Sequence, residues 1–162
     1  MIITVQAVKE KPNDVKTACE QLGIRHFWIE LNGANQDLLN NQLTLKYLRK
    51  RIRELLEILN TSQEVALVHC SAGLHRTGTL GFTLLRLGSQ GALGKAEAYL
   101  ALKTLREDTW AGVGDWRIDL AEENLVAPIL EERPEDPDIP DDCPSGELAE
   151  GQAQAASAGS GE

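Results

Sequence analysis

Short apolar runs alternate with amphipathic segments along the first 130 residues of the chain. Apolar runs that predict buried strands lie at 2–8, 26–31 and 65–69. Apolar residues recur at helical spacing and predict helices at 14–22, 43–59, 79–87, 95–106 and 115–130. Strands that alternate with helices are typical of a parallel sheet. The pattern therefore predicts an α/β fold, with a compact, mostly parallel central sheet flanked by helices.

Local features refine this pattern. The run at 65–69 (VALVH) is bounded by polar residues, as expected of a central strand in a parallel sheet. Residues 32–41 (NGANQDLLNN) are rich in turn-forming types and predict a loop before the long helix. Gly23 follows the first helical segment, at a position where glycine often ends a helix. We therefore expect 65–69 inside the sheet and an irregular connection at 32–41.

The net charge of the chain is concentrated near its C-terminal end. Residues 1–130 hold 15 acidic and 15 basic side chains, whereas 131–162 hold ten acids and one base. The second segment is also rich in Pro, Gly and Ala, so it has little apolar surface to bury. We expect one domain at 1–130 and a disordered tail at 131–162.

The long helix predicted at 43–59 carries a basic face. It comprises Lys46, Arg49, Lys50, Arg51 and Arg53. The simplest interpretation is a solvated helix face. The alternatives are contact with an acidic partner or with the acidic tail of the same chain, and the tail is itself a candidate contact for a basic partner.

Several classes of protein do not fit this composition. No apolar run approaches the roughly 20 residues that a membrane span needs, and the first residues do not resemble a signal peptide. The three cysteines and three histidines are widely spaced, without a disulfide framework or a metal-ligand pattern. A reducing cytoplasmic environment is therefore the expectation, with no metal site.

The segment 69–78 (HCSAGLHRTG) joins the third predicted strand to an apolar helix. A short loop that enters a helix directs successive backbone N–H groups inward and forms an anion-binding cradle at the positive end of the helix dipole. Gly73 permits backbone torsions that a Cβ would block. Cys70 lies at the strand end facing this cradle, which favours its thiolate form. The segment therefore predicts a reactive thiolate beside an anion site.

Two more side chains complete this predicted site. Arg76 offers a planar guanidinium suited to two phosphate oxygens, and Thr77 can donate its hydroxyl to the cysteine sulfur. Together these groups are suited to nucleophilic attack on phosphorus without a metal or other cofactor. The other loop residues expected to line the phosphate site are Ser71, Ala72, Gly73, Leu74 and His75. The alternative interpretation is a buried strand-end cysteine beside an unrelated turn.

The segment HCSAGLHRTG resembles the His-Cys-x5-Arg-Ser/Thr-Gly signature of cysteine-based protein tyrosine and dual-specificity phosphatases. This resemblance implies a catalytic domain at 1–130 and a phosphocysteine intermediate on Cys70. It also implies that Arg76 and the 71–76 amides hold the phosphate and that Thr77 stabilises the leaving thiolate. His69 is implied to tune the cysteine through hydrogen bonds to the loop. The short chain, without a Trp-Pro-Asp loop, is similar to the compact dual-specificity group.

The resemblance also implies a general acid, an Asp on a loop upstream of the cysteine. Asp37 is the only carboxylate within 32–41. Asn32, however, begins a tripeptide similar to the Asp-Gly-Ala of small phosphatases, in which the Asp is the acid. On that alignment Asp37 or Glu30 must replace it. We favour Asp37, with Glu30 and an ordinary solvated aspartate as the alternatives.

The expected substrate is a phosphorylated protein carrying phosphotyrosine or phosphoserine/threonine. The cradle lacks the extra lysines of relatives that favour phosphoinositides, and nucleic acid is not an expected partner. The alternatives are a non-protein phosphate, such as an inositol phosphate, a phosphoinositide or an RNA 5′ phosphate, or a phosphate-binding module with weak turnover. Cys19 is expected to pack in the core, the alternative being a protective disulfide with Cys70.

Overall fold

The computed structural model describes residues 1–62 and 64–131, so the tail predicted for 131–162 lies outside the described residues except for its first position. The elements in chain order are β1 (Ile2–Gln6), the 3-10 turn η1 (Val8–Glu10), α1 (Pro12–Gln21), β2 (His26–Glu30), α2 (Gln36–Asn40), α3 (Gln42–Thr61), β3 (Leu67–His69), α4 (His75–Gly88), α5 (Lys95–Leu105), α6 (Glu107–Val113), α7 (Asp115–Ala121), the π-helical segment η2 (Glu122–Val126) and α8 (Ala127–Leu130).

The predicted α/β fold is confirmed. In the described residues the sheet has three strands in the order β2-β1-β3, and both pairings are parallel. Thr4 of β1 lies level with Trp28 of β2 and His69 of β3. The central strand is β1, whereas the sequence predicted a central position for 65–69. That prediction was wrong because a short apolar run also suits an edge strand, and Leu67 of β3 is 58% exposed.

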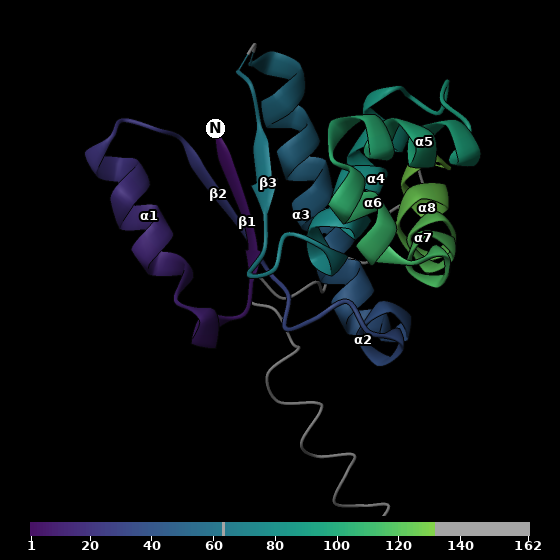
Figure 1. Ribbon diagram of the computed structural model, residues 1–162, viewed down its shortest axis with the longest axis horizontal. Coiled ribbons are helices and arrows are strands. Elements are labelled where there is room, and N and C mark those ends of the chain that lie inside the picture. Colours follow the sequence, from purple (N-terminus) through teal and green to yellow (C-terminus); the bar gives the residue numbers. More distant parts are fainter. Residues whose placement is uncertain (63, 132–162) are drawn as a thin grey trace, which may run out of the picture.

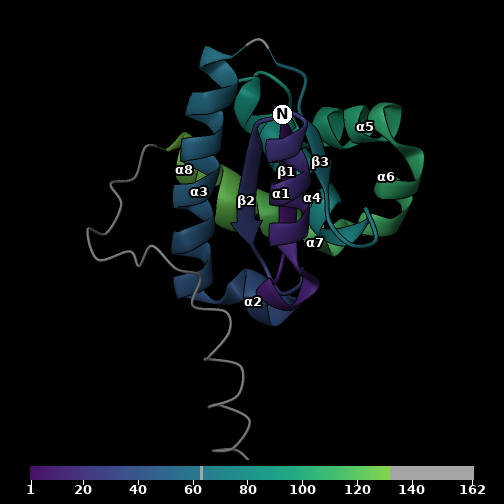
Figure 2. The same ribbon diagram turned by 90° about the vertical axis from the view of Figure 1, so that its left-hand side faces the viewer.

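Helices cover the two faces of this sheet unequally. Figure 1 shows α1 alone on one face, while α3 and the helices from α4 onward lie on the other. In Figure 2 the view is onto the face that α1 covers, with the three strands behind it. Ile3, Val5 and Ile29 are almost completely buried and form the strand contribution to the core. Within the described residues, no helix combines the length and apolarity that crossing a bilayer requires.

Helix α1 shows how local sequence sets the boundaries of an element. It begins at Pro12. Proline suits the first turn of a helix because the backbone N–H groups of that turn have no acceptor within the helix, so the missing N–H of proline costs no hydrogen bond. At the other end Gly23 adopts φ +65°, and the Ile24 N–H donates to the carbonyl of Cys19 at 2.8 Å. This is the expected glycine ending of a helix. Cys19 is 2% exposed and unpaired, consistent with core packing.

The long helix α3 matches the predicted pattern, with Leu45, Leu48, Ile52 and Leu55 all buried. Its basic face is not simply solvated. The Arg51 guanidinium lies 4.3 Å from the centre of the Phe27 ring and donates to the Trp28 carbonyl at 2.9 Å. Part of this face therefore packs against β2 and stabilises the fold.

Residues 32–41 are not the continuous loop that the sequence predicted, because they contain α2. The side chain of Asn35 accepts a hydrogen bond from the Leu38 N–H at 2.9 Å and so caps this helix. Leu39 is 1% exposed and anchors the helix in the core. A further helix without a predicted counterpart is α6, which packs against α4 and α5.

The contact between α4 and α6 depends on Gly78 at the end of the signature segment. A Cβ at this position would lie 2.5 Å from the Cβ of Val113, far inside van der Waals contact. We expect Gly78→Ala to lower the free energy of unfolding by about 1–3 kcal/mol in urea titrations, because it overpacks this interface. Gly88→Ala in the same helix is the matched control, since no heavy atom lies within 4 Å there. Equal stabilities of the two variants would contradict this account.

Candidate active site

The signature segment lies where the carboxyl ends of the three strands meet. Because all three strands run parallel, β1 leads into η1, β2 leads to Leu31 and β3 leads to Cys70 at the same edge of the sheet. This edge is the usual ligand-binding position in parallel α/β sheets. The fold thus places the predicted thiolate beside two other chain segments that the sequence pattern did not connect with it.

The loop that follows Cys70 curves around its sulfur. Gly73 has φ +68°, a conformation that favours glycine, and α4 begins at His75, so that Arg76 and Thr77 belong to its first turn. The backbone N–H groups of Gly73 and Thr77 donate to the sulfur, as does the Thr77 hydroxyl at 3.2 Å. These donors converge on one point at the start of the helix, which is the geometry of an anion site.

The surroundings of Cys70 favour its ionised form. Burial raises the pKa of the thiol, but the hydrogen bonds from Thr77 and Gly73 and the positive charge of Arg76 outweigh this effect. The net pKa is therefore lowered from the ordinary value of 9.0. A lowered pKa increases the thiolate fraction near neutral pH, and the thiolate is the nucleophilic form of cysteine.

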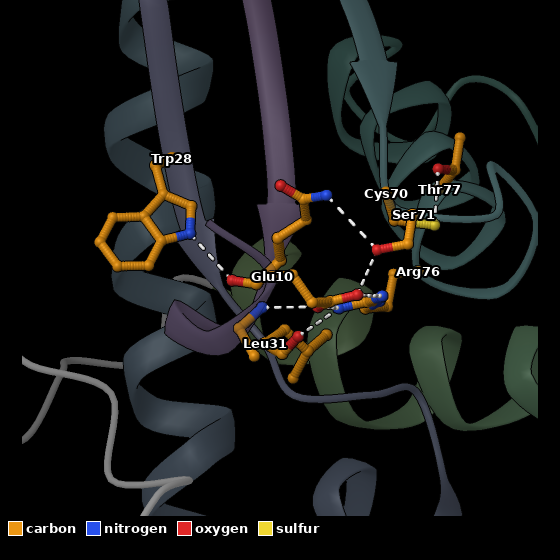
Figure 3. A network of polar contacts seen from close by, with 9 residues as sticks. Glu10, Trp28, Leu31, Cys70, Ser71, Arg76 and Thr77 are labelled. Carbon is orange, nitrogen blue, oxygen red and sulfur yellow. Dashed lines mark hydrogen bonds and ion pairs between the residues drawn. The ribbon is translucent and has the colours of Figure 1, made fainter. Parts of the chain in front are cut away.

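Arg76 is held by partners from the other two strand ends (Figure 3). Its two terminal nitrogens donate to the carboxylate of Glu10, at 2.7 Å for Nη2, and Nη1 also donates to the Leu31 carbonyl at 2.8 Å. The hydrogen bond to Glu10 raises the pKa of Arg76. The guanidinium side chain is only 12% exposed, so this pairing fixes it beside the loop.

Glu10 is the residue of this site that sequence reasoning missed. Its carboxylate accepts from Arg76, from the Ser71 hydroxyl and from the Ala7 N–H at 2.8 Å. The hydrogen bond from Arg76 is the main reason that the pKa of Glu10 falls from 4.5 to about 2. Glu10 lies shortly after a strand of a parallel sheet, which is a position where functional residues often lie. This position becomes informative only when β1 is known to lie next to β3.

Helix α6 supports the loop from its outer side. The Thr109 hydroxyl, fully buried, donates to the Gly73 carbonyl at 2.7 Å. Next to it, a Cβ at Gly112 would lie 3.2 Å from the side chain of Leu74. The Arg106 guanidinium also lies against Gly73. The conformation of the loop is therefore set partly by a helix that the sequence pattern did not predict.

The histidine before Cys70 contacts the central strand. His69 Nε2 lies 2.8 Å from the Thr4 hydroxyl, and the same hydroxyl lies 2.9 Å from His26 Nε2. Thr4 is fully buried between the two flanking strands. The partner of the His69 side chain is thus on β1, whereas the resemblance implied hydrogen bonds to the loop.

Asp37, the residue favoured as proton donor, makes no hydrogen bond to the loop among the described residues. Asp37 lies in the first turn of α2, is exposed and makes no side-chain hydrogen bond or ion pair within the part of the chain that is described. Glu30 is the last residue of β2, and its backbone N–H donates to the Tyr47 hydroxyl at 3.0 Å.

His75, which the sequence placed at the phosphate site, is largely exposed at the start of α4. Its partial burial and the charges of Arg117 and Arg76 lower its pKa.

Comparison with known families supplies independent evidence. A family model described as tyrosine phosphatase family matches residues 13–111, which include the whole segment 69–78. A comparison with curated proteins gives no match. The matched region covers more than half of the chain and contains β2, β3, the loop and most of the helices around it. The chain therefore belongs to the tyrosine phosphatase family, and this membership supports phosphatase activity in general.

Proposed function

We propose that this protein hydrolyses phosphomonoesters through a phosphocysteine intermediate on Cys70. The observation that supports this most strongly is the convergence of three hydrogen-bond donors and the Arg76 charge on the Cys70 sulfur. Hydrogen-bond donors and positive charge around a sulfur favour its thiolate form, and the same groups favour binding of an anion beside it. Family membership agrees with such chemistry.

The proposed reaction has two steps. The Cys70 thiolate attacks phosphorus, an S–P bond forms and the P–O bond to the leaving group breaks. Water then attacks the phosphocysteine, the S–P bond breaks and inorganic phosphate leaves with the thiolate restored. Amides of residues 71–76 and the guanidinium of Arg76 hold the oxygens of the phosphoryl group in both steps. Thr77 stabilises the thiolate when it leaves, through the hydrogen bond described above.

An alkoxide leaving group needs a proton, and we assign its donation to Asp37. Glu10 is closer to Arg76, but with a pKa of about 2 it holds no proton to donate at neutral pH. Asp37 lies on α2, after the end of β2. Its exposure leaves it accessible to a bound substrate, and Glu30 is the alternative donor.

The proposed substrates are phosphotyrosine or phosphoserine/threonine side chains of proteins, because the loop residues Ser71, Ala72 and Leu74 bring no additional positive charge. A phosphate-binding module with weak turnover is the second candidate. It is favoured by one observation, that Asp37 makes no hydrogen bond or ion pair with the loop in the described part of the chain. Comparing phosphopeptides with inositol phosphates and 5′-phosphorylated RNA as substrates separates protein from non-protein phosphates.

Cys70→Ser tests the proposed nucleophile directly. We expect turnover of an aryl phosphate to fall to background while inorganic phosphate still binds, because serine keeps the cradle and loses the thiolate. The measurements are release of the phenol and titration calorimetry with phosphate. Wild-type protein should also yield a phosphorylated Cys70 peptide after rapid acid quenching. Turnover retained by the serine variant would refute the mechanism.

Thr77→Ala tests the origin of the thiolate. The Thr77 hydroxyl lowers the pKa of Cys70. The alkylation rate of Cys70 by iodoacetamide should therefore increase with pH in both proteins, and the wild type should show this increase at a lower pH than the variant. Mass spectrometry of the Cys70 peptide gives these rates residue by residue, so that the other cysteines do not interfere. Identical pH profiles for the two proteins would show that the hydroxyl has no such role.

The variants Asp37→Asn and Glu30→Gln form a matched pair that identifies the proton donor. We expect Asp37→Asn to reduce kcat for alkyl phosphates by on the order of 10²-fold. The kcat for aryl phosphates with acidic phenols should fall much less, because their leaving groups depart without a proton. A selective loss in Glu30→Gln alone would move the assignment to Glu30. Equally low rates on alkyl phosphates for both variants and the wild type would favour the binding module.

A further inference from the structure

Four basic side chains form a stripe along α3. Their spacing of i, i+3, i+4 and i+7 places them on one face of the helix, and they are Lys46, Arg49, Lys50 and Arg53. This basic stripe lies opposite the face that buries Leu48 and Leu55. Arg51 is not part of it, because its guanidinium packs against β2. The first acidic residue on the same face is Glu57, so the stripe carries four positive charges over about 10 Å of helix.

The described part of the chain ends close to the basic stripe. Arg49 Nη1 donates to the Asn124 carbonyl of η2 at 2.9 Å, and η2 packs against α3. From η2 the chain continues directly into α8, and Glu131 follows the last residue of that helix. The helical rise from Asn124 to Glu131 amounts to about 10 Å. The chain therefore reaches position 131 within a short distance of the stripe.

The residues that follow carry the complementary charge. Residues 132–142 hold six acids and one base, and prolines recur there at every third position. Proline favours the polyproline II helix, in which residues three apart lie on one edge at intervals of about 9 Å. Glu135, Asp138 and Asp141 have this spacing. The interval between successive carboxylates on such an edge thus matches the length of the basic stripe.

We propose that the acidic segment 132–142 binds the basic stripe of α3 in the same chain. A single exposed ion pair contributes little to such an interaction. Several pairs formed at once contribute more, and the tether raises the effective concentration of the segment at the stripe to roughly the millimolar range. The segment therefore covers the stripe in the free protein, and an acidic partner binds there only by displacing it.

The stripe also has the charge to bind the acidic segment of a second copy or an acidic partner protein. The position of residue 131 favours the segment of the same chain, because the short connection to η2 keeps that segment beside the stripe. Binding to a second copy or to a partner has no such tether and depends on protein concentration. Independence of concentration therefore distinguishes the proposed contact from both alternatives.

The first pair of variants alters the tail of the full chain. The test variant combines Glu135→Gln, Asp138→Asn and Asp141→Asn. Its control combines Glu147→Gln, Glu150→Gln and Glu162→Gln, which remove the same charge where acids are sparse. Neither variant changes a residue of the described fold, so both remain informative whatever the tolerance of α3 to substitution.

The second pair of variants alters lysines of the fold. The test variant combines Lys46→Glu and Lys50→Glu on α3, and the control combines Lys16→Glu and Lys103→Glu on α1 and α5. The control lysines are 59% and 41% exposed, and each forms one i,i+4 ion pair of the kind that contributes little to stability. Thermal unfolding of both variants checks that they remain folded.

Cross-linking with a carbodiimide, which joins a carboxylate directly to a lysine amine, gives the first readout. We expect cross-links from 132–142 to Lys46 and Lys50 in the wild type. Their yield should fall about fivefold in the tail test variant, whose remaining acids still react, and stay unchanged in its control. Salt at about 1 M, where charges are screened beyond roughly 3 Å, should lower the wild-type yield in the same way.

Nuclear magnetic resonance of the full chain gives the second readout. The ¹⁵N–¹H NOE of amides in 132–142 reports motion on the picosecond to nanosecond timescale. It should decrease in the lysine test variant, because the segment is released, and stay at the wild-type value in the lysine control.

Three outcomes overturn the proposal. In an equal mixture of ¹⁵N-labelled and unlabelled protein, cross-links between labelled and unlabelled peptides would place the segment on a second copy. Equal yields at Lys16, Lys103 and the α3 lysines would show attraction without a defined site. Absence of cross-links to α3, with the same NOE values in all variants, would show that the segment does not bind the fold.

Discussion

Parallel pairing of β1 with a strand on each side is the constraint on which this structure depends. It brings the chain back to the same edge of the sheet after each strand, so that η1, Leu31 and the Cys70 loop become neighbours although they are far apart in sequence. The first turn of α4 then adds a converging set of N–H donors. A cysteine with a lowered pKa, a guanidinium and a set of converging N–H donors are brought together by topology, and the individual side chains tune what the topology provides.

The parts of the fold that follow from local patterns were predictable. The spacing of Leu45, Leu48 and Ile52 indicated α3, and Gly23 indicated the end of α1, because both signals lie within a few residues of the element that they describe. The same holds for the loop after β3, where the order of residue types already indicated the contact between Thr77 and Cys70. Family membership agrees with that interpretation over the central part of the chain.

What could not be predicted depends on neighbours that are distant in sequence. Glu10 has no unusual local context, and its role emerges only when the strand order places η1 beside the loop. The short helices α2 and α6 lack a long apolar repeat. They are held instead by a cap from Asn35 and by burial of Thr109 and Leu39 against other elements. The edge position of β3 is likewise a property of the whole sheet, which an apolar run of a few residues does not encode.

The ion pair between Glu10 and Arg76 also connects this site to the behaviour of the protein in acid. The pKa of Glu10 is about 2 in the folded chain against 4.5 as the ordinary value, so between these values the unfolded chain takes up the proton more readily. The pair therefore contributes fully to the free energy of unfolding above about pH 4.5, and this contribution disappears as the pH falls towards 2. Resistance to acid unfolding thus originates partly at the edge of the sheet where the proposed chemistry takes place.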